Sequence, residues 1–84
     1  MINVEFNIYN EKGVNLTNHS IYDEEDNIPV LLEAYLRKFI LDKELEKETL
    51  TLEITESDEN GEYITTDNYS VTMKSPRNIE IDLI

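Results

Sequence analysis

Carboxylates are the most abundant side chains in this sequence that could carry chemistry. Nineteen aspartates and glutamates stand against seven lysines and arginines, one histidine and no cysteine. Paired carboxylates perform acid–base catalysis when an apolar cleft raises the pKa of one while its neighbour stays ionised. Here nearly all carboxylates lie in polar runs or at alternate strand positions, where both members of any pair would remain solvated. The sequence therefore predicts no catalytic residue, and we expect the protein not to be an enzyme.

One acidic segment has the spacing of a calcium-binding loop. Aligning Gly61 with the invariant glycine of an EF-hand places Glu56 and Asp58 at the first and third ligand positions. Asn60 then takes the fifth position and Asp67 the last, where an EF-hand has a longer glutamate. The flanking residues alternate like strands, whereas an EF-hand needs helices. We therefore expect a solvated hairpin tip, with no metal and no cofactor.

The remaining chemistry is limited by composition. Without cysteine there are no disulfides or thiolate metal sites, and the single histidine, His19, is expected to be an ordinary surface residue. The first residues lack the basic and apolar stretches of a signal peptide, and no apolar run is long enough to span a membrane. We expect a cytoplasmic protein, in a bacterial host cell if the gene belongs to a phage.

Alternating apolar and polar residues predict several strands. Residues 2–8 alternate cleanly, residues 10–13 form a turn, and the alternation resumes less clearly through residue 22, which predicts a hairpin. Further strands are expected near residues 49–55, 62–66, 69–74 and 79–83, with Asn60-Gly61 as a hairpin dipeptide. A bulge or turn at Asp67-Asn68 leaves open whether residues 62–74 form one bent strand or two.

A helix is predicted over roughly residues 28 to 46. Its start is indicated by Asn27 or Asp26 as the N-cap and by Pro29 in the first turn. Seven apolar residues at helical spacing form one stripe that would face a core. They are Ile28, Leu31, Leu32, Tyr35, Leu36, Phe39 and Ile40.

These elements predict a single α+β domain over residues 1–84. We expect an antiparallel sheet of four to six strands with one amphipathic helix packed on one face, in the order β-β-α-β-β-(β)-β. The opposite face is expected to be flat, polar and acidic, which suits docking. It would carry Asn3, Glu5, Asn7, Glu53, Glu80 and Asp82.

The formal net charge of −12 indicates the kind of partner. It disfavours direct binding to nucleic acid or to an anionic membrane and favours a basic protein. Two acidic segments are the candidate contact, together with two tyrosines, because tyrosine is enriched at binding hot spots. The predicted partner-binding residues are Asp23, Glu24, Glu25, Asp26, Glu56, Asp58, Glu59, Glu62, Asp67, Tyr63 and Tyr69.

In size, acidity, absence of cysteine and absence of a catalytic set, the whole chain resembles the small phage-encoded inhibitors. These include anti-CRISPR proteins and uracil-DNA glycosylase inhibitors, some of which mimic DNA, and the resemblance involves no shared motif. It implies an inhibitor that blocks the basic surface of a nucleic-acid-binding protein or nuclease. An immunity or antitoxin-like protein is one alternative. Another is a regulatory or virion assembly module whose acidity serves solubility.

Overall fold

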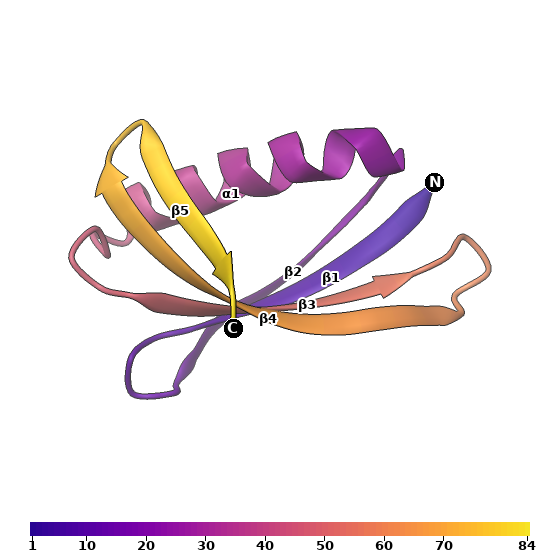
Figure 1. Ribbon diagram of the computed structural model, residues 1–84, viewed down its shortest axis with the longest axis horizontal. Coiled ribbons are helices and arrows are strands. Elements are labelled where there is room, and N and C mark those ends of the chain that lie inside the picture. The colour runs from indigo at the N-terminus through magenta and orange to yellow at the C-terminus, as the bar shows by residue number, and fades with distance from the viewer.

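The computed structural model describes all 84 residues and contains five strands and one α-helix (Figure 1). The strands are β1 (Ile2–Tyr9), β2 (Asn15–Asp23), β3 (Leu50–Ser57), β4 (Tyr63–Ser75) and β5 (Asn78–Leu83). A 3-10 turn, η1 (Glu25–Asn27), leads into the helix α1 (Ile28–Asp42). The protein therefore belongs to the predicted α+β class, with a single helix.

All five strands form one antiparallel sheet in the order β2-β1-β3-β4-β5. Because β2 and β3 both run antiparallel to β1, which lies between them, they are parallel to each other. A connection between parallel strands must return along the sheet, and α1 makes this return over one face (Figure 1). The 15 residues of α1 span about 22 Å, which nearly matches the length of about 26 Å of the eight-residue β3.

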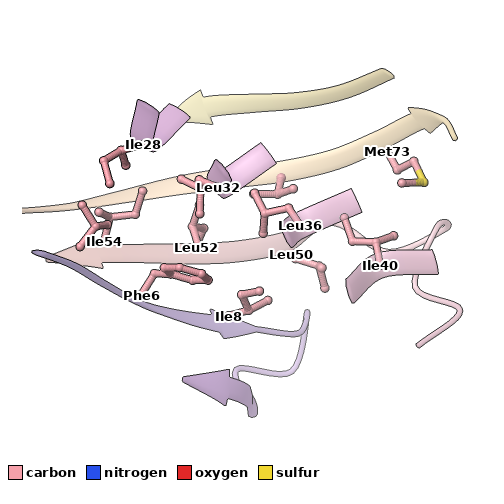
Figure 2. Packing of buried hydrophobic residues seen from close by; sticks show 12 residues of the cluster. Phe6, Ile8, Ile28, Leu32, Leu36, Ile40, Leu50, Leu52, Ile54 and Met73 are labelled. Carbon is pink, nitrogen blue, oxygen red and sulfur yellow. The ribbon is translucent and has the colours of Figure 1, made fainter. Parts of the chain in front are cut away.

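The core lies between α1 and the face of the sheet that it covers. Residues opposite each other on neighbouring strands, such as Phe6 and Ile54 or Ile8 and Leu52, point to the same side. The apolar stripe of α1 packs against them (Figure 2), and no polar side chain is buried. The buried residues are Val4, Phe6, Ile8, Ile28, Leu32, Leu36, Ile40, Leu50, Leu52, Ile54, Val71 and Met73.

The helix ends at Asp42, so the predicted end near residue 46 is wrong. The reason is a Schellman motif, in which Glu44 takes a left-handed conformation with φ of 56°. The backbone N–H of Leu45 donates to the carbonyl of Ile40 at 2.9 Å, and that of Glu44 donates to Leu41 at 3.3 Å. Leu45 then packs against the core, which turns the chain back toward the sheet.

The start of the helix also differs from the expectation in its capping. Asn27 is the N-cap and Pro29 lies in the first turn as predicted, but the Asn27 side chain makes no capping bond. The preceding 3-10 turn holds Asn27 at φ −86° and ψ −19°, a helical conformation instead of the extended one of a usual N-cap. Its Nδ2 donates instead to Oδ1 of Asp23 at 2.9 Å.

The question left open over residues 62–74 is resolved as one strand. Asp67 pairs with Ile54 and Asn68 with Glu53 in an unbroken register, so β4 continues through both residues. The irregularity of this pair lies instead at Glu56 and Ser57, next to the β3–β4 turn. The element order is therefore β-β-α-β-β-β, without the optional extra strand.

The uncovered face of the sheet is polar, as predicted, but it is not flat. The registers place all six predicted residues on this face, beside serine, threonine and asparagine. Asn7 joins the strands by donating to Glu53 and accepting from Asn18. However, β4 and β5 twist out of the plane of β1 and β3 (Figure 1), as sheets of L-residues do.

Candidate protein-binding surface

The connections between the elements define two ends of the molecule (Figure 1). The β1–β2 turn, the α1–β3 loop and the β4–β5 turn lie at one end. The backbone N–H of Thr49 donates to Glu11 Oε1 at 3.0 Å, and Arg37 Nε donates to the carbonyl of Pro76 at 3.2 Å. At the other end lie the N-terminus, the β2–α1 connection and the β3–β4 turn. The two ends differ strongly in charge.

Eight of the nineteen carboxylates lie at or beside the second end, and Asp67 lies further in on β4, opposite Ile54; we call these nine the acidic pole. Asp23 pairs with Ile2 and Ser57 pairs with Asn3, so only β1 separates the end of β2 from the end of β3. Two strand spacings amount to about 10 Å. All nine carboxylates belong to the set that the sequence assigned to partner binding. The acidic pole consists of Asp23, Glu24, Glu25, Asp26, Glu56, Asp58, Glu59, Glu62 and Asp67.

All seven lysines and arginines belong to the opposite end, and seven carboxylates pair with them or lie near them, of which Glu33 lies further along α1 toward the acidic pole. Arg37 pairs with Glu33 at 2.8 Å and Lys38 with Asp42 at 3.0 Å. We call this end the mixed pole, and its formal charge is zero. It contains Lys12, Arg37, Lys38, Lys43, Lys47, Lys74 and Arg77 with Glu11, Glu33, Asp42, Glu44, Glu46, Glu48 and Glu80.

The net charge is therefore concentrated on part of the surface. The three carboxylates outside both poles, Glu5, Glu53 and Asp82, lie on the polar face of the sheet, and with the acidic pole they account for the whole −12. No lysine or arginine pairs with a carboxylate of the acidic pole. Its one ion pair joins the N-terminal amine of Met1 to Glu24 at 3.9 Å. With a Debye length of about 8 Å at physiological salt, neighbouring carboxylates add their fields at the surface.

Two aspartates of the acidic pole also organise the backbone. Asp58 Oδ1 accepts from the backbone N–H groups of Asn60 and Glu62, both at 2.9 Å, and so closes the β3–β4 turn. Asp23 Oδ1 accepts from Asn27 Nδ2 and from the backbone N–H of Glu24, and these two bonds lower the pKa of Asp23. In both residues the second carboxylate oxygen makes no hydrogen bond within the protein and remains available to a partner.

The segment with calcium-loop spacing forms the predicted hairpin tip. Strands β3 and β4 flank it on both sides, whereas an EF-hand loop lies between two helices. Gly61 adopts a φ of 84°, and its N–H donates to the carbonyl of Asp58 at 3.0 Å. The oxygen-bearing residues of this segment therefore belong to a β-hairpin, with Asp58 and Asn60 in the turn and Glu56 and Asp67 in β3 and β4.

The two candidate tyrosines lie in different surroundings. The side chain of Tyr63 is 67% exposed at the start of β4. Tyr69 is partly buried on the same face of the sheet as α1. Its burial, together with the charges of Asp67 and Glu56, raises the pKa of Tyr69. The structure thus brings Tyr69 together with two carboxylates of the acidic pole.

His19 on β2 and Tyr35 on α1 form an aromatic stack. Their ring centroids are 4.4 Å apart and nearly parallel, and Tyr35 also contacts the edge of the buried Phe6. His19 is exposed and Tyr35 packs against the core, as predicted. The stack itself was not expected, because it depends on the register that places His19 opposite Phe6.

An apolar groove of about 300 Å³ opens beside the acidic pole, between α1 and the strands β3, β4 and β5. In Figure 2, Ile28 and Leu32 of α1 lie opposite Ile54 and Leu52 of β3. The sequence does not indicate this groove, because the spacing of Ile28 and Leu32 is that of an ordinary core stripe. Only the placement of α1 on the sheet decides which residues of that stripe line a groove.

No helix in the structure has the length and apolar character needed to cross a membrane. The chain matches no protein-family model, no curated protein and no solved structure. Evidence for its function therefore comes from its fold and its charge distribution.

Proposed function

We propose that this protein is a small inhibitor that binds the basic surface of a nucleic-acid-binding protein or nuclease and blocks it by electrostatic occlusion. It binds without catalysing a reaction. The observation that carries the proposal is the separation of charge between the two poles. Acidity that served solubility alone would not require every lysine and arginine to lie away from one end. An acidic end without basic side chains attracts a cationic surface and steers its approach.

The dimensions support the same proposal. The molecule measures 38 × 25 × 20 Å, so the end that carries the acidic pole is about 25 Å across. Duplex DNA carries one charge per about 1.7 Å, hence about 15 charges over 25 Å. The eight carboxylates at that end are more than half of that number. A channel that binds a duplex would therefore meet a comparable negative charge at the acidic pole.

The test uses the immobilised protein, a bacterial lysate and elution along a salt gradient, with identification by mass spectrometry. Basic nucleic-acid-binding proteins should elute as the salt rises, and duplex DNA should displace them. A triple variant of the acidic pole, Glu25→Gln, Glu59→Gln and Glu62→Gln, should weaken binding of the captured protein by at least about tenfold. None of these three side chains makes a hydrogen bond within the protein, so the fold should remain intact.

The matched control is Glu44→Gln, Glu46→Gln and Glu48→Gln at the mixed pole. Both triple variants change the net charge from −12 to −9. A difference in binding between them therefore reports the position of the removed charges and not their number. The control should bind within about twofold of the wild type, because its carboxylates lie among lysines. Equal losses in both variants, or capture that is insensitive to salt and DNA, would contradict the proposal.

A further inference from the structure

The groove beside the acidic pole has an apolar floor and an acidic rim. Its floor includes Ile28, Leu32 and Ile54, which are 7%, 8% and 9% exposed. Glu33 lies at the rim on α1, and Glu56 lies at the rim on β3. The complete lining is Val4, Ile28, Pro29, Leu32, Glu33, Ile54, Glu56, Tyr69 and Ile81. An occupant would thus meet apolar side chains inside and carboxylates outside.

The charge on the rim is unequal. Glu33 is neutralised by Arg37 at 2.8 Å, whereas Glu56 has no ion pair. Asp67 follows on the same face of the sheet, because it pairs with Ile54 and is two residues from Tyr69. Both carboxylates help to raise the pKa of Tyr69, which indicates a negative potential at this end of the groove. A cationic group is therefore favoured beside the groove and an anionic group is disfavoured.

The size of the groove restricts what it can hold. Small-molecule sites generally occupy about 300–1,000 Å³, so this groove, at about 300 Å³, is at the lower limit. It is open to solvent and shallow compared with a cofactor site, but it has room for a bulky apolar side chain. Such a side chain would be removed from water by the floor and by the ring of Tyr69.

We propose that the groove receives one apolar side chain of the basic partner, while a lysine or arginine next to it pairs with Glu56 and Asp67. This inference rests on the proposed function and adds specificity to it. Charge alone attracts many basic proteins, whereas an apolar anchor in a pocket supplies much of the affinity for one partner. The recognised segment is thus basic with a single embedded apolar residue.

The test uses two synthetic peptides with blocked ends, Lys-Lys-Leu-Lys-Lys and Lys-Lys-Ser-Lys-Lys. Titrations followed by NMR on the wild-type protein should show about tenfold tighter binding of the leucine peptide, because burial of a leucine is worth about one factor of ten or more. The methyl resonances of Ile28, Ile54 and Ile81 should shift with the leucine peptide and not with the serine peptide. Both peptides should bind less tightly as salt increases.

Ile81→Ser at the rim of the groove should remove the preference for leucine. Ile81 is 36% exposed, so the fold should tolerate the change. The matched control is Ile64→Ser, which alters a more exposed isoleucine (51%) near the acidic pole but outside the groove. It should keep the preference. Glu56→Gln should weaken the binding of both peptides.

The outcomes distinguish this inference from the proposed function. Equal affinity for the two peptides, with unshifted methyl groups, would overturn the groove as an anchor site and leave the acidic pole as the contact. Absence of salt-sensitive binding by either peptide would overturn the proposed function and this inference with it. The methyl shifts of the wild-type protein decide the matter even if the Ile81 variant proves unstable.

Discussion

Asn10 and Asp58 perform the same task in two of the three hairpins of the sheet, β1–β2 and β3–β4. The side-chain oxygen of each accepts from the backbone N–H groups two and four residues further along, at 2.9 to 3.0 Å. Three residues after each of them a glycine adopts a positive φ, 80° at Gly13 and 84° at Gly61. An amide therefore serves as well as a carboxylate in this turn. The charge of Asp58 is not required by the fold.

Asp58→Ala should lower the free energy of unfolding by about 1 kcal/mol, since two backbone donors lose their acceptor. Asp58→Asn should have a free energy of unfolding close to that of the wild type, because Asn10 closes the β1–β2 turn with an amide. Urea denaturation measures both, with the midpoint falling and the m-value unchanged for the alanine variant. If the two variants lost equal stability, the charge of Asp58 and not its hydrogen bonds would support the turn.

At the scale of the element, the C-terminus of α1 carries a strained residue. Glu44 occupies the left-handed position of a Schellman motif, where glycine is usual because it has no Cβ. The motif is retained because Leu45 reaches the core and because two backbone bonds satisfy carbonyls of the last turn. The strain at Glu44 therefore accompanies a favourable end of the helix.

Glu44→Gly should raise the free energy of unfolding by about 1 kcal/mol, which is the usual penalty for a non-glycine residue in this conformation. Glu44→Ala is the control, because it removes the same charge and keeps the Cβ. Thermal unfolding followed by circular dichroism should show a higher Tm for the glycine variant only. An equal rise in both variants would assign the effect to the charge.

The elements also show how far local patterns determine structure. The strands at residues 2–8 and 79–83 follow from apolar periodicity and are confirmed. The stripe of α1 is confirmed except at Leu31, which is 40% exposed because it lies at the margin of the face that α1 turns toward the sheet. The end of α1 and the continuity of β4 through Asp67 and Asn68 depend on partners far along the chain. Leu45 packs against the core, and Asp67 pairs with Ile54, only when the whole sheet has assembled. Such contacts leave no periodic signal.

At the scale of the whole molecule, the separation of charge opposes folding. The nine carboxylates of the acidic pole have no lysine or arginine to offset them, and their mutual repulsion is stronger in the compact state than in the unfolded chain. The mixed pole has no such excess, since its charges balance. The acidic pole should thus reduce stability at one identifiable end of the molecule.

Sodium chloride should stabilise the wild type, because the Debye length falls from about 30 Å at 0.01 M to about 3 Å at 1 M. A gain of about 1 kcal/mol would raise the Tm by about 4–8 °C for a domain of this size. The acidic-pole triple variant should have a higher Tm at low salt and a weaker salt dependence. The mixed-pole triple variant should show neither change. Similar behaviour of the two would contradict a localised repulsion.

The amino-acid sequence by itself determined the class of fold, the amphipathic helix, most strand positions and which residues carry charge, because these features arise from local spacing and composition. The tertiary structure alone decided that residues 23–26 and 56–62 meet at one pole, that every basic side chain belongs to the other, and that a groove opens beside Glu56. These relations follow from the strand order β2-β1-β3-β4-β5 and from the path of α1. Pairing between distant strands is selected by the packing of the whole core, so the sequence of a single segment does not determine its partner strand.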